Sequence, residues 1–521
     1  MFRVLMITCL FSPLARFASA DEVRPNILFC IADDQSWMHA GAYGCTWVKT
    51  PAFDQVAKDG LLFMNAYTPN AKCAPSRACL LTGRNTWQLE EACNHWCFFP
   101  PQFTTYPEVL ANNGYHVGYT GKGWAPGIAK NKDGVNREMT GKRYGGKTQK
   151  PPTQAISNND YAGNFEAFLD GNAGKPWCFW YGSTEPHRGY EYGTGVSVGG
   201  KSIEDIDEVP PFWPDNEVTR NDMLDYALEI EHFDSHLGRM LSLMKERGQL
   251  DNTIVIVTAD NGMPFPRIKG QEYELSNHLP FAVMWKNGIV EPGRYVEDLV
   301  SFSDVAPTIL EAAGLDWKQS GMAETPGRSL FPLMKNLPSK KAHREIVVFG
   351  KERHDIGRPE DQGYPMRGIV DGHFLYIRNY ETSRWPAGNP ETGYLNCDGS
   401  PTKTELLNGR RYETDIAGRW QMAFGKRPAE ELYRLKDDKY CMNNLAANPT
   451  FEIVRQKLEA KMVERLKQEE DPRMDGPSNY FEKFPYADNK GKGFHERFMA
   501  GEKLNAGWVN ASDFESEPIA D

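Results

Sequence analysis

The sequence predicts an α/β fold with a large, mostly parallel sheet, followed by a smaller α+β part with an antiparallel sheet. Apolar runs rich in β-branched and aromatic residues alternate with helical patterns as far as about residue 340, which is typical of a parallel sheet covered by helices. After Pro338 the runs become shorter and follow one another, which favours antiparallel strands. A chain of 521 residues also exceeds the usual size of one domain, so we expect two folded parts.

Four apolar runs are the clearest predicted strands of the first part, and they cover residues 26–32, 116–121, 177–183 and 253–259. A helix is predicted over 222–248, because its apolar residues form one stripe and Gly248 ends it. The stripe contains Tyr226, Ile230, Phe233, Leu237, Leu241 and Met244. In the second part, shorter strands are predicted within 345–351, 366–380 and 431–437, followed by an amphipathic helix near 451–468.

Residues 1–20 are predicted to be a cleavable signal peptide. They combine an early Arg3, a short apolar stretch and an Ala-Ser-Ala ending at Ala20. No later run approaches the length of a membrane span, so we expect export to a periplasmic, extracellular or lysosomal-type compartment without a membrane anchor helix. The expected organisation is then a catalytic domain over 21–340, an α+β subdomain over 341–475 and a polar tail over 476–521 that either wraps the surface or is partly disordered.

Net charge and cysteine content restrict the partners and the covalent chemistry. A formal charge of −11 argues against nucleic acid as a partner, although a polyanionic substrate fits if positive charge is concentrated in a pocket. Without Cys9, nine cysteines remain, and an odd number leaves at least one unpaired. Cys30 and Cys178 lie in predicted core strands. Cys93 and Cys97 are spaced so that they could pair, but the sequence leaves the connectivity open.

Polar residues follow each of the four predicted strands. Ligand sites of open α/β sheets lie beyond the carboxyl ends of the strands, so we expect these clusters to converge. Asp-Asp and Asp-Asn-Gly after a strand are individually common as turn residues, but four clusters in the same topological place favour a site. The residues are Asp33, Asp34, Lys122, His187, Asp260 and Asn261.

The acidic clusters favour a hard divalent cation. Asp33, Asp34, Asp260 and Asn261 offer only oxygen ligands. Such ligands suit Ca²⁺ or Mg²⁺ rather than zinc.

Residues 71–85, AKCAPSRACLLTGRN, present a cysteine at the start of a predicted short helix. Pro75 is suited to the first position of a helix that runs to about Leu81, with Gly83 as its stop. Cys73 would then lie at the helix N-terminus with Arg77 one turn along, and we expect these surroundings to lower the pKa of the thiol. A thiolate facing a hard cation is nevertheless poor chemistry, and an oxygen nucleophile would fit better. The residues alone leave this mismatch unsolved.

The motif CAPSRACLLTGR, residues 73–84, resembles the sulfatase signature C-x-P-S-R followed closely by L-T-G-R. Further segments are similar to the family, among them RPNILFCIADDQ, TGKG, EPH, TIVIVTADNG, KGQEYE and FSDVAPTILEAAGL. TADNGMPFP, YPMRGIV and ELYRLKDDKYCMNNLAANPTF are similar to the sulfamidase (heparan N-sulfatase) branch. The resemblance implies an alkaline-phosphatase-like sandwich that hydrolyses a sulfate ester or sulfamate on a sulfated, glycosaminoglycan-like carbohydrate. It leaves N- against O-sulfate open.

The resemblance also implies a role for each matching residue. Cys73 would be oxidised to formylglycine (3-oxoalanine) by a formylglycine-generating enzyme or an anaerobic maturase, and its hydrate would attack sulfur. One Ca²⁺, with Mg²⁺ as the alternative, would be held by the modified residue 73 together with the four oxygen ligands. Arg77, Lys122 and Lys269 would stabilise the hydrate and the sulfate, and His187 would protonate the leaving group as a general acid. The implied cation ligands are Asp33, Asp34, Cys73, Asp260 and Asn261.

The chain departs from the family pattern at one position, where G-K-x-H is replaced by GKGW with Trp124 in place of histidine. The family histidine assists release of the sulfate, so a remote histidine such as His39, His95 or His278 takes its place or the role is dispensable.

One group near the predicted domain junction allows two interpretations, because it either reads acidic groups of the substrate or only solvates a loop. The group is Arg353, His354 and Arg358. Two rival functions also stay open: a phosphoester hydrolase of the same superfamily, and a non-catalytic protein that binds sulfated glycans.

Overall fold

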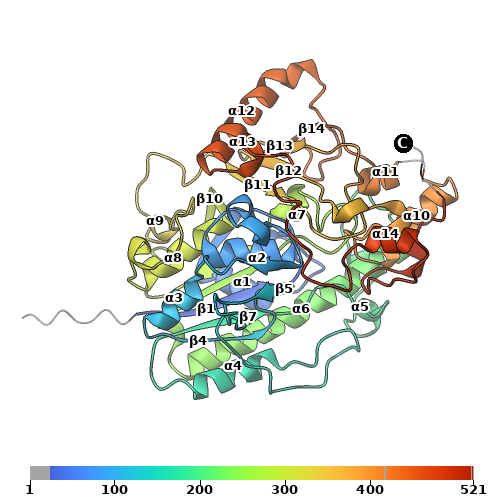
Figure 1. Ribbon diagram of the computed structural model, residues 1–521. Helices are drawn as coiled ribbons and strands as arrows, with labels where there is room; N and C mark the ends of the chain where they lie inside the picture. Colours follow the sequence, from blue (N-terminus) through green and yellow to red (C-terminus); the bar gives the residue numbers. More distant parts are fainter. Residues whose placement is uncertain (1–23, 416–417, 518, 520–521) are drawn as a thin grey trace, which may run out of the picture.

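The structure is a computed structural model and describes residues 24–415, 418–517 and 519. Its centre is an eight-stranded sheet in the order β10-β2-β9-β8-β1-β7-β4-β6 (Figure 1). Neighbouring strands are parallel except where β9 pairs with β2 and β8, so the predicted large, mostly parallel sheet is confirmed. The strands are β1 (Asn26–Ala32), β2 (Leu61–Tyr67), β4 (His116–Gly121), β6 (Lys142–Arg143), β7 (Trp177–Gly182), β8 (Thr253–Ala259), β9 (Phe281–Met284) and β10 (Arg294–Ser301).

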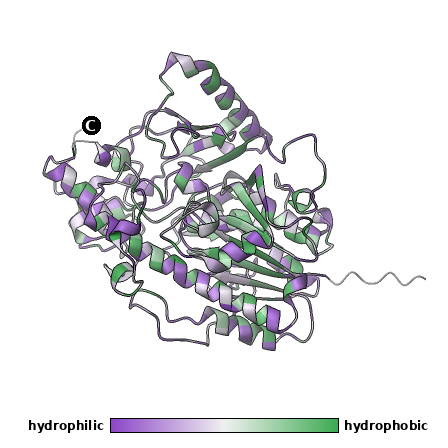
Figure 2. Ribbon diagram, turned by 180° about the vertical axis from the view of Figure 1, so that it is seen from behind, coloured by the Kyte–Doolittle hydropathy of each residue, from purple (hydrophilic) through white to green (hydrophobic). Residues whose placement is uncertain are grey.

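Helices cover both faces of this sheet, which explains why its central strands are apolar throughout. In β1, Ile27 and Phe29 pack into one layer while Leu28 and Cys30 pack into the other. Figure 2 shows the hydrophobic strands lying inside helices of mixed character. The first layer contains α2 (Cys73–Thr82), α3 (Tyr106–Asn112), α8 (Val305–Ala312) and α9 (Phe331–Met334), and the second contains α1 (Pro51–Lys58), α4 (Tyr161–Asp170) and α6 (Glu217–Glu246).

The structure contains all three predicted helices, and the amphipathic helix near 451–468 is confirmed as α12 (Glu452–Gln468). The long helix is confirmed as α6, and its predicted apolar stripe is buried. The helix near the cysteine motif begins at Cys73, two residues earlier than the predicted start at Pro75. Proline is accepted there because the N–H groups of the first helical turn have no partner within the helix. Gly83 ends α2 as predicted, with a left-handed φ of 69°.

A second, four-stranded sheet is antiparallel in the order β11-β12-β13-β14, as the sequence predicts. Successive residues of a strand point to opposite faces of the sheet. Accordingly, Val347 of β11 packs with residues of the large sheet, and Val348 packs with residues of α12. This part contains β11 (Val347–Lys351), β12 (Met366–Val370), β13 (Phe374–Asn379), β14 (Glu430–Arg434), α12 (Glu452–Gln468) and α13 (Pro472–Asp475).

The segment between β13 and β14 leaves the small sheet and packs against the first part of the chain. Tyr394 and Leu406 share a buried cluster with Ile230 of α6 and with Met263, which follows β8. The two halves of the sequence therefore share a core near the carboxyl end of the large sheet. This segment contains α10 (Pro401–Arg411) and α11 (Arg419–Phe424). Short strands and α-helices elsewhere in the described chain are β3 (Cys97–Phe99), β5 (Gly127–Ala129), α5 (Thr194–Ser197), α7 (Glu274–Asn277) and α14 (Phe494–Met499).

The end of the chain wraps this returning segment. Trp508 Nε1 donates to the carbonyl oxygen of Leu395 (2.8 Å), and Lys403 Nζ lies 3.0 Å from Asp513 Oδ2. The predicted signal peptide lies outside the described residues. Among the helices that the structure describes, none is both long and apolar enough to cross a bilayer.

The nine cysteines of the described residues are all free thiols, including Cys93 and Cys97, which the sequence left open as a pair. Cys30 and Cys178 are buried on β1 and β7, as predicted.

We expect Phe233→Ala to lower the thermal unfolding midpoint strongly. The Phe233 ring is buried in the layer beneath the sheet and stacks on Tyr181 with centroids 5.0 Å apart. Truncating such a side chain costs about 3–5 kcal/mol in transfer and cavity terms. Calorimetry should show this loss, whereas Lys245→Ala on the exposed face of the same helix should change stability by less than about 0.5 kcal/mol. Equal midpoints for the two variants would contradict the assigned core.

Candidate active site

The carboxyl ends of β1, β4, β7 and β8 bring their polar residues together, as the sequence predicts. The Asp34 N–H donates to Asp260 Oδ1 (3.0 Å), which joins the residues after β1 to those after β8. Lys122 Nζ, after β4, lies 2.7 Å from Asp33 Oδ2. The Asp33 N–H donates to the carbonyl oxygen of Glu185 after β7 (3.0 Å). The strand ends converge because these strands are neighbours in parallel register.

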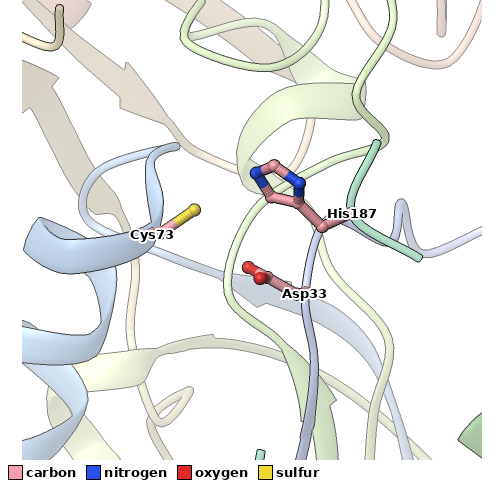
Figure 3. A group of neighbouring side chains, drawn as sticks. All are labelled: Asp33, Cys73 and His187. Carbon is pink, nitrogen blue, oxygen red and sulfur yellow. The ribbon is translucent and has the colours of Figure 1, made fainter. Parts of the chain in front are cut away.

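Cys73 enters the same volume from the first turn of α2 (Figure 3). Its Sγ lies 3.9 Å from Asp34 Oδ1. One potential ligand atom from each of Asp33, Asp34, Cys73 and Asp260 lies within 4.8 Å of the others, and the same holds for Asp33, Cys73 and His187. The helix start therefore places residue 73 between the acidic cluster and the histidine.

The oxygen atoms of this cluster fit a hard divalent cation. Asn261 Nδ2 donates to Asp34 Oδ1 (2.7 Å), while the buried Asn261 Oδ1 has no hydrogen-bond partner among the described residues. Burial, and after it the nearby Asp33 carboxylate, raise the pKa of Asp260 to about 7. A cation bound by these oxygens would satisfy the amide oxygen and offset the crowding of negative charge. The donor set contains oxygens that suit Ca²⁺ or Mg²⁺.

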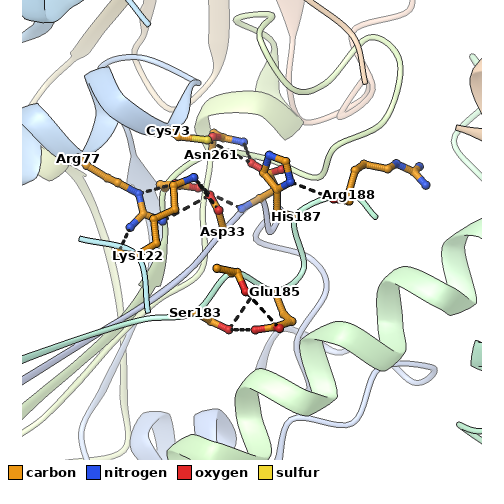
Figure 4. A network of polar contacts seen from close by, with 12 residues as sticks. Asp33, Cys73, Arg77, Lys122, Ser183, Glu185, His187, Arg188 and Asn261 are labelled. Carbon is orange, nitrogen blue, oxygen red and sulfur yellow. Dashed lines mark hydrogen bonds and ion pairs between the residues drawn. The ribbon is translucent and has the colours of Figure 1, made fainter. Parts of the chain in front are cut away.

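Three cationic side chains contact the acidic cluster, and Figure 4 labels two of them, Arg77 and Lys122. Arg77 Nε lies 2.8 Å from Asp260 Oδ2, and Arg77 Nη1 donates to the carbonyl oxygen of Lys122 (2.9 Å). Lys269 Nζ lies 2.7 Å from Asp34 Oδ2. Burial acts to raise the pKa of Asp33, but Lys122 and Arg77 hold it well below the usual range. The site is therefore dense in fixed charge of both signs, which suits a small anion beside a cation.

The expected acidification of the Cys73 thiol is wrong. Burial raises its pKa well above the ordinary value, and the carboxylates of Asp33, Asp260 and Asp34 act in the same direction, while Lys122 opposes them. Burial outweighs the expected effect of the helix N-terminus, and the guanidinium of Arg77 is already bound to the carboxylates of Asp260 and Asp33. As a plain thiol, residue 73 is therefore not an activated nucleophile.

His187 stands at the edge of the site and is half-buried. Its Nδ1 lies 3.1 Å from the carbonyl oxygen of Arg188. A carbonyl oxygen can only accept, so Nδ1 carries the hydrogen of this bond and Nε2 is left to face the site. Arg188 itself is held by Asp222 through both terminal nitrogens and by the Pro264 carbonyl oxygen, so the support of the histidine is rigid.

Trp124 occupies the position where the family pattern has histidine. Its Nε1 donates to the carbonyl oxygen of Ala74 (3.0 Å), so the indole supports the first turn of α2.

The three histidines considered as substitutes all have partners. His39 Nδ1 lies 3.1 Å from the Tyr226 hydroxyl, and His278 Nδ1 lies 2.7 Å from Glu274 Oε1. His95 Nδ1 lies 2.8 Å from Asp355, a carboxylate that also binds Lys72.

The group predicted at the domain junction is buried. Arg353 Nη1 donates to the carbonyl oxygen of Phe484 (2.8 Å), and Arg358 Nε donates to that of Trp385 (2.9 Å). His354 Nε2 lies 2.7 Å from Asn70 Oδ1. These contacts are with neighbouring chain segments, and substrate contact by Arg353, His354 and Arg358 stays a prediction.

Asp398 is a residue of the site that the sequence did not indicate. It follows no predicted strand and lies in the irregular segment before α10, so neither strand position nor the family motifs point to it. Its Oδ2 lies 2.8 Å from Lys269 Nζ, and one of its oxygens lies within 4.8 Å of ring and carboxylate atoms of His187 and Asp34. Burial acts to raise the pKa of Asp398, but Lys269, Lys72 and His187 hold it well below the usual value.

Comparison with known proteins gives a family. A family model described as Sulfatase matches residues 25–315. An ulvan-active sulfatase of Formosa agariphila is 30% identical over 466 residues, covering 87% of this chain and 82% of the relative. Human N-sulphoglucosamine sulphohydrolase is 26% identical over 505 residues, covering 88% of this chain and 94% of the relative.

Solved structures share the fold. BT4656 in complex with its substrate D-glucosamine-2-N,6-O-disulfate has a TM-score of 0.62 at 19% identity, over 86% of this chain and 98% of its own. Phosphonate monoester hydrolase of Agrobacterium radiobacter has a TM-score of 0.60 at 18% identity, over 86% of this chain and 96% of its own. At these identities the likeness concerns the fold and leaves the substrate open.

We expect Ca²⁺ to raise the thermal unfolding midpoint of protein treated with a chelator. A cation present at about 100 times its Kd stabilises the folded state by about 2.7 kcal/mol, and Asn261→Ala should weaken this response because it removes a ligand oxygen. Asn379→Ala is the matched control, since Asn379 lies on β13 and is also buried with an Oδ1 that has no partner in the described part of the chain. Differential scanning fluorimetry with a calcium titration measures the effect. A calcium response that is the same in both variants would contradict the assigned site.

Proposed function

The chain belongs to the sulfatase family, and from that premise we propose that it hydrolyses a sulfate ester or a sulfamate on a sulfated carbohydrate. The enzyme class follows from the family, whose members are sulfuric ester hydrolases. The carbohydrate, the modification of Cys73 and the cation are parts of the proposal.

The observation that carries the proposal is a buried cysteine beside a cluster of hard oxygen ligands. The thiol of Cys73 has a raised pKa and faces three carboxylates, so it is unsuited to attack as sulfur. Conversion to formylglycine replaces the thiol by an aldehyde whose hydrate offers two hydroxyl groups, one to attack the sulfate and one to release it. An oxygen nucleophile is compatible with a hard cation, and this removes the mismatch between a thiol nucleophile and such a cation.

Asp33, Asp34, Asp260 and Asn261 would hold the cation, Ca²⁺ with Mg²⁺ as the alternative. When bound, the cation would favour ionisation of an oxygen nucleophile and polarise the sulfate. Arg77 would stabilise the hydrate and the sulfate, and its bonds to Asp260 and to the segment after β4 hold it at the site.

Lys122 and Lys269 supply positive charge for the sulfate oxygens, whose negative charge grows as sulfur is transferred. Lys269 is buried and Lys122 is half-buried, and both lie beside carboxylates that raise their pKa against the effect of desolvation and keep them charged. His187, with Nε2 directed at the site, is the proposed general acid that gives a proton to the leaving alcohol or amine.

Three relatives support a sulfated carbohydrate as substrate. Two relatives are named for sulfated sugars, ulvan and N-sulphoglucosamine, and each is matched over most of its length. A further relative is N-acetylglucosamine-6-O-sulfatase of Bacteroides thetaiotaomicron, with 24% identity over 60% of this chain. The similarity to a sulfamidase branch and to O-sulfatases leaves both kinds of sulfate as candidates.

We also propose export after removal of residues 1–20, and maturation of Cys73 by a formylglycine-generating enzyme or an anaerobic maturase.

A phosphoester or phosphonate hydrolase is the second candidate, because the fold is shared with phosphonate monoester hydrolase. Parallel assays of sulfate and phosphate release separate the two activities, and a non-catalytic glycan-binding protein would release neither.

We expect the tryptic peptide that contains residue 73 to have the mass of 3-oxoalanine when the protein is made in a cell that modifies sulfatases. Cys73→Ala should then abolish release of inorganic sulfate, because it removes the nucleophile. Cys79→Ala is the matched control, since Cys79 is a buried cysteine on the same helix. An unmodified cysteine in a fully active enzyme would exclude formylglycine as the nucleophile.

We expect the loss of activity in His187→Ala to depend on the leaving group. Loss of a general acid costs about 10²–10⁴-fold for a poor leaving group, whereas 4-nitrophenolate needs no proton and should leave with a much smaller loss. Steady-state kinetics on a sugar sulfate and on 4-nitrophenyl sulfate measure the difference. His116 is a half-buried histidine that stacks on Phe168. His116→Ala serves as the control and should leave both activities near the wild-type level. Equal losses on both substrates would argue against the acid role.

A further inference from the structure

Asp398 comes from the second half of the chain and reaches a site built by the first half. The segment that carries it lies beyond residues 25–315, which match the sulfatase family model. It is buried beside Lys269, and its side chain is only 6% exposed. Neither the family match nor the sequence motifs give this residue a role.

The contacts of Lys269 define what Asp398 does. An ammonium group has three N–H donors. One binds Asp34 Oδ2 at 2.7 Å and a second binds Asp398 Oδ2 at 2.8 Å. One N–H is left for the sulfate, and its direction is fixed once the other two are held.

The backbone around the two residues keeps this geometry rigid. Gly270 has a left-handed φ of 74°, and a Cβ there would lie 3.1 Å from the Asn396 carbonyl oxygen, so the two segments are in close contact. On the other side, Lys403 Nζ donates to the carbonyl oxygen of Cys397 (2.8 Å). The backbone that carries Asp398 is therefore held by contacts on both sides.

We propose that Asp398 is a positioning residue of the proposed sulfatase reaction, which holds the Lys269 ammonium so that its remaining N–H binds the sulfate. The inference rests on the proposed function. Asp34 alone is a poor support for this lysine, because the same carboxylate is a proposed cation ligand. Asp398 supplies the second support and leaves Asp34 available to the cation.

The test is a double-mutant cycle between Asp398→Asn and Lys269→Met, with 4-nitrophenyl sulfate as substrate. Loss of a residue that orients a site group lowers activity by about 10–100-fold in comparable sites, and we expect a loss of that size for Asp398→Asn. It should appear in kcat more than in KM, because the lysine contact strengthens as charge develops on the sulfate. The double variant should be within about twofold of Lys269→Met alone, since the two residues act as one unit. Asp398→Glu should recover part of the activity.

A matched control separates positioning from stability. Lys403 and Asp513 form a second fully buried Lys–Asp pair, 3.0 Å apart, which supports the same returning segment. Asp513→Asn should lower the thermal midpoint at least as much as Asp398→Asn while changing kcat by less than about threefold. Equal kinetic losses in the two variants, or losses of Asp398→Asn and Lys269→Met that multiply in the double variant, would overturn the proposal.

Binding of inorganic sulfate distinguishes this proposal from the proposed function. If the wild-type enzyme releases no sulfate from any sulfated sugar or aryl sulfate, the proposed function fails. Calorimetric titration with sodium sulfate then still tests the lysine: weaker binding by Asp398→Asn than by Asp513→Asn supports positioning, and equal binding refutes it.

Discussion

The site depends on the balance between crowded carboxylates and the cations that hold them. Asp33, Asp34 and Asp260 lie at the ends of two adjacent parallel strands, so the sheet itself forces their negative charges together. Like charges at this spacing are tolerated in a buried site only with opposite charges in contact. Arg77 and Lys122 supply such contacts. The helix α2 and the segment after β4 bring these two cations to the same edge of the sheet.

This charge balance determines which nucleophile can work. A thiolate would add another negative charge to the cluster, and the pKa of Cys73 is raised first by burial and then by the nearby carboxylates. A neutral hydrate of an aldehyde adds no charge until a cation assists its ionisation. The same surroundings that make residue 73 inert as cysteine are therefore suited to an oxygen nucleophile. The modification that the family motif implies has a physical reason in the geometry.

The segment between β13 and β14 gives the second half of the chain a part in the site. Its hydrophobic residues pack on α6 and beside the residues after β8, and its polar loop brings Asp398 to Lys269. Catalytic machinery and specificity are often placed on loops held by a rigid scaffold. Here the scaffold comes from both halves, because the end of the chain in turn fixes the loop through Trp508 and Asp513.

The sequence by itself determined the large parallel sheet, the small antiparallel sheet, the long helix α6 and the convergence of Asp33, Lys122, His187 and Asp260. These follow from local periodicity and from strand order, since residues after parallel strands meet at one edge. It could not give the pKa of Cys73 or the place of Asp398 in the site. A pKa depends on which charges become neighbours after folding, and Asp398 lies in an irregular loop whose path is set by long-range packing. Only the tertiary structure decided these two features, because both depend on contacts between segments far apart in the chain.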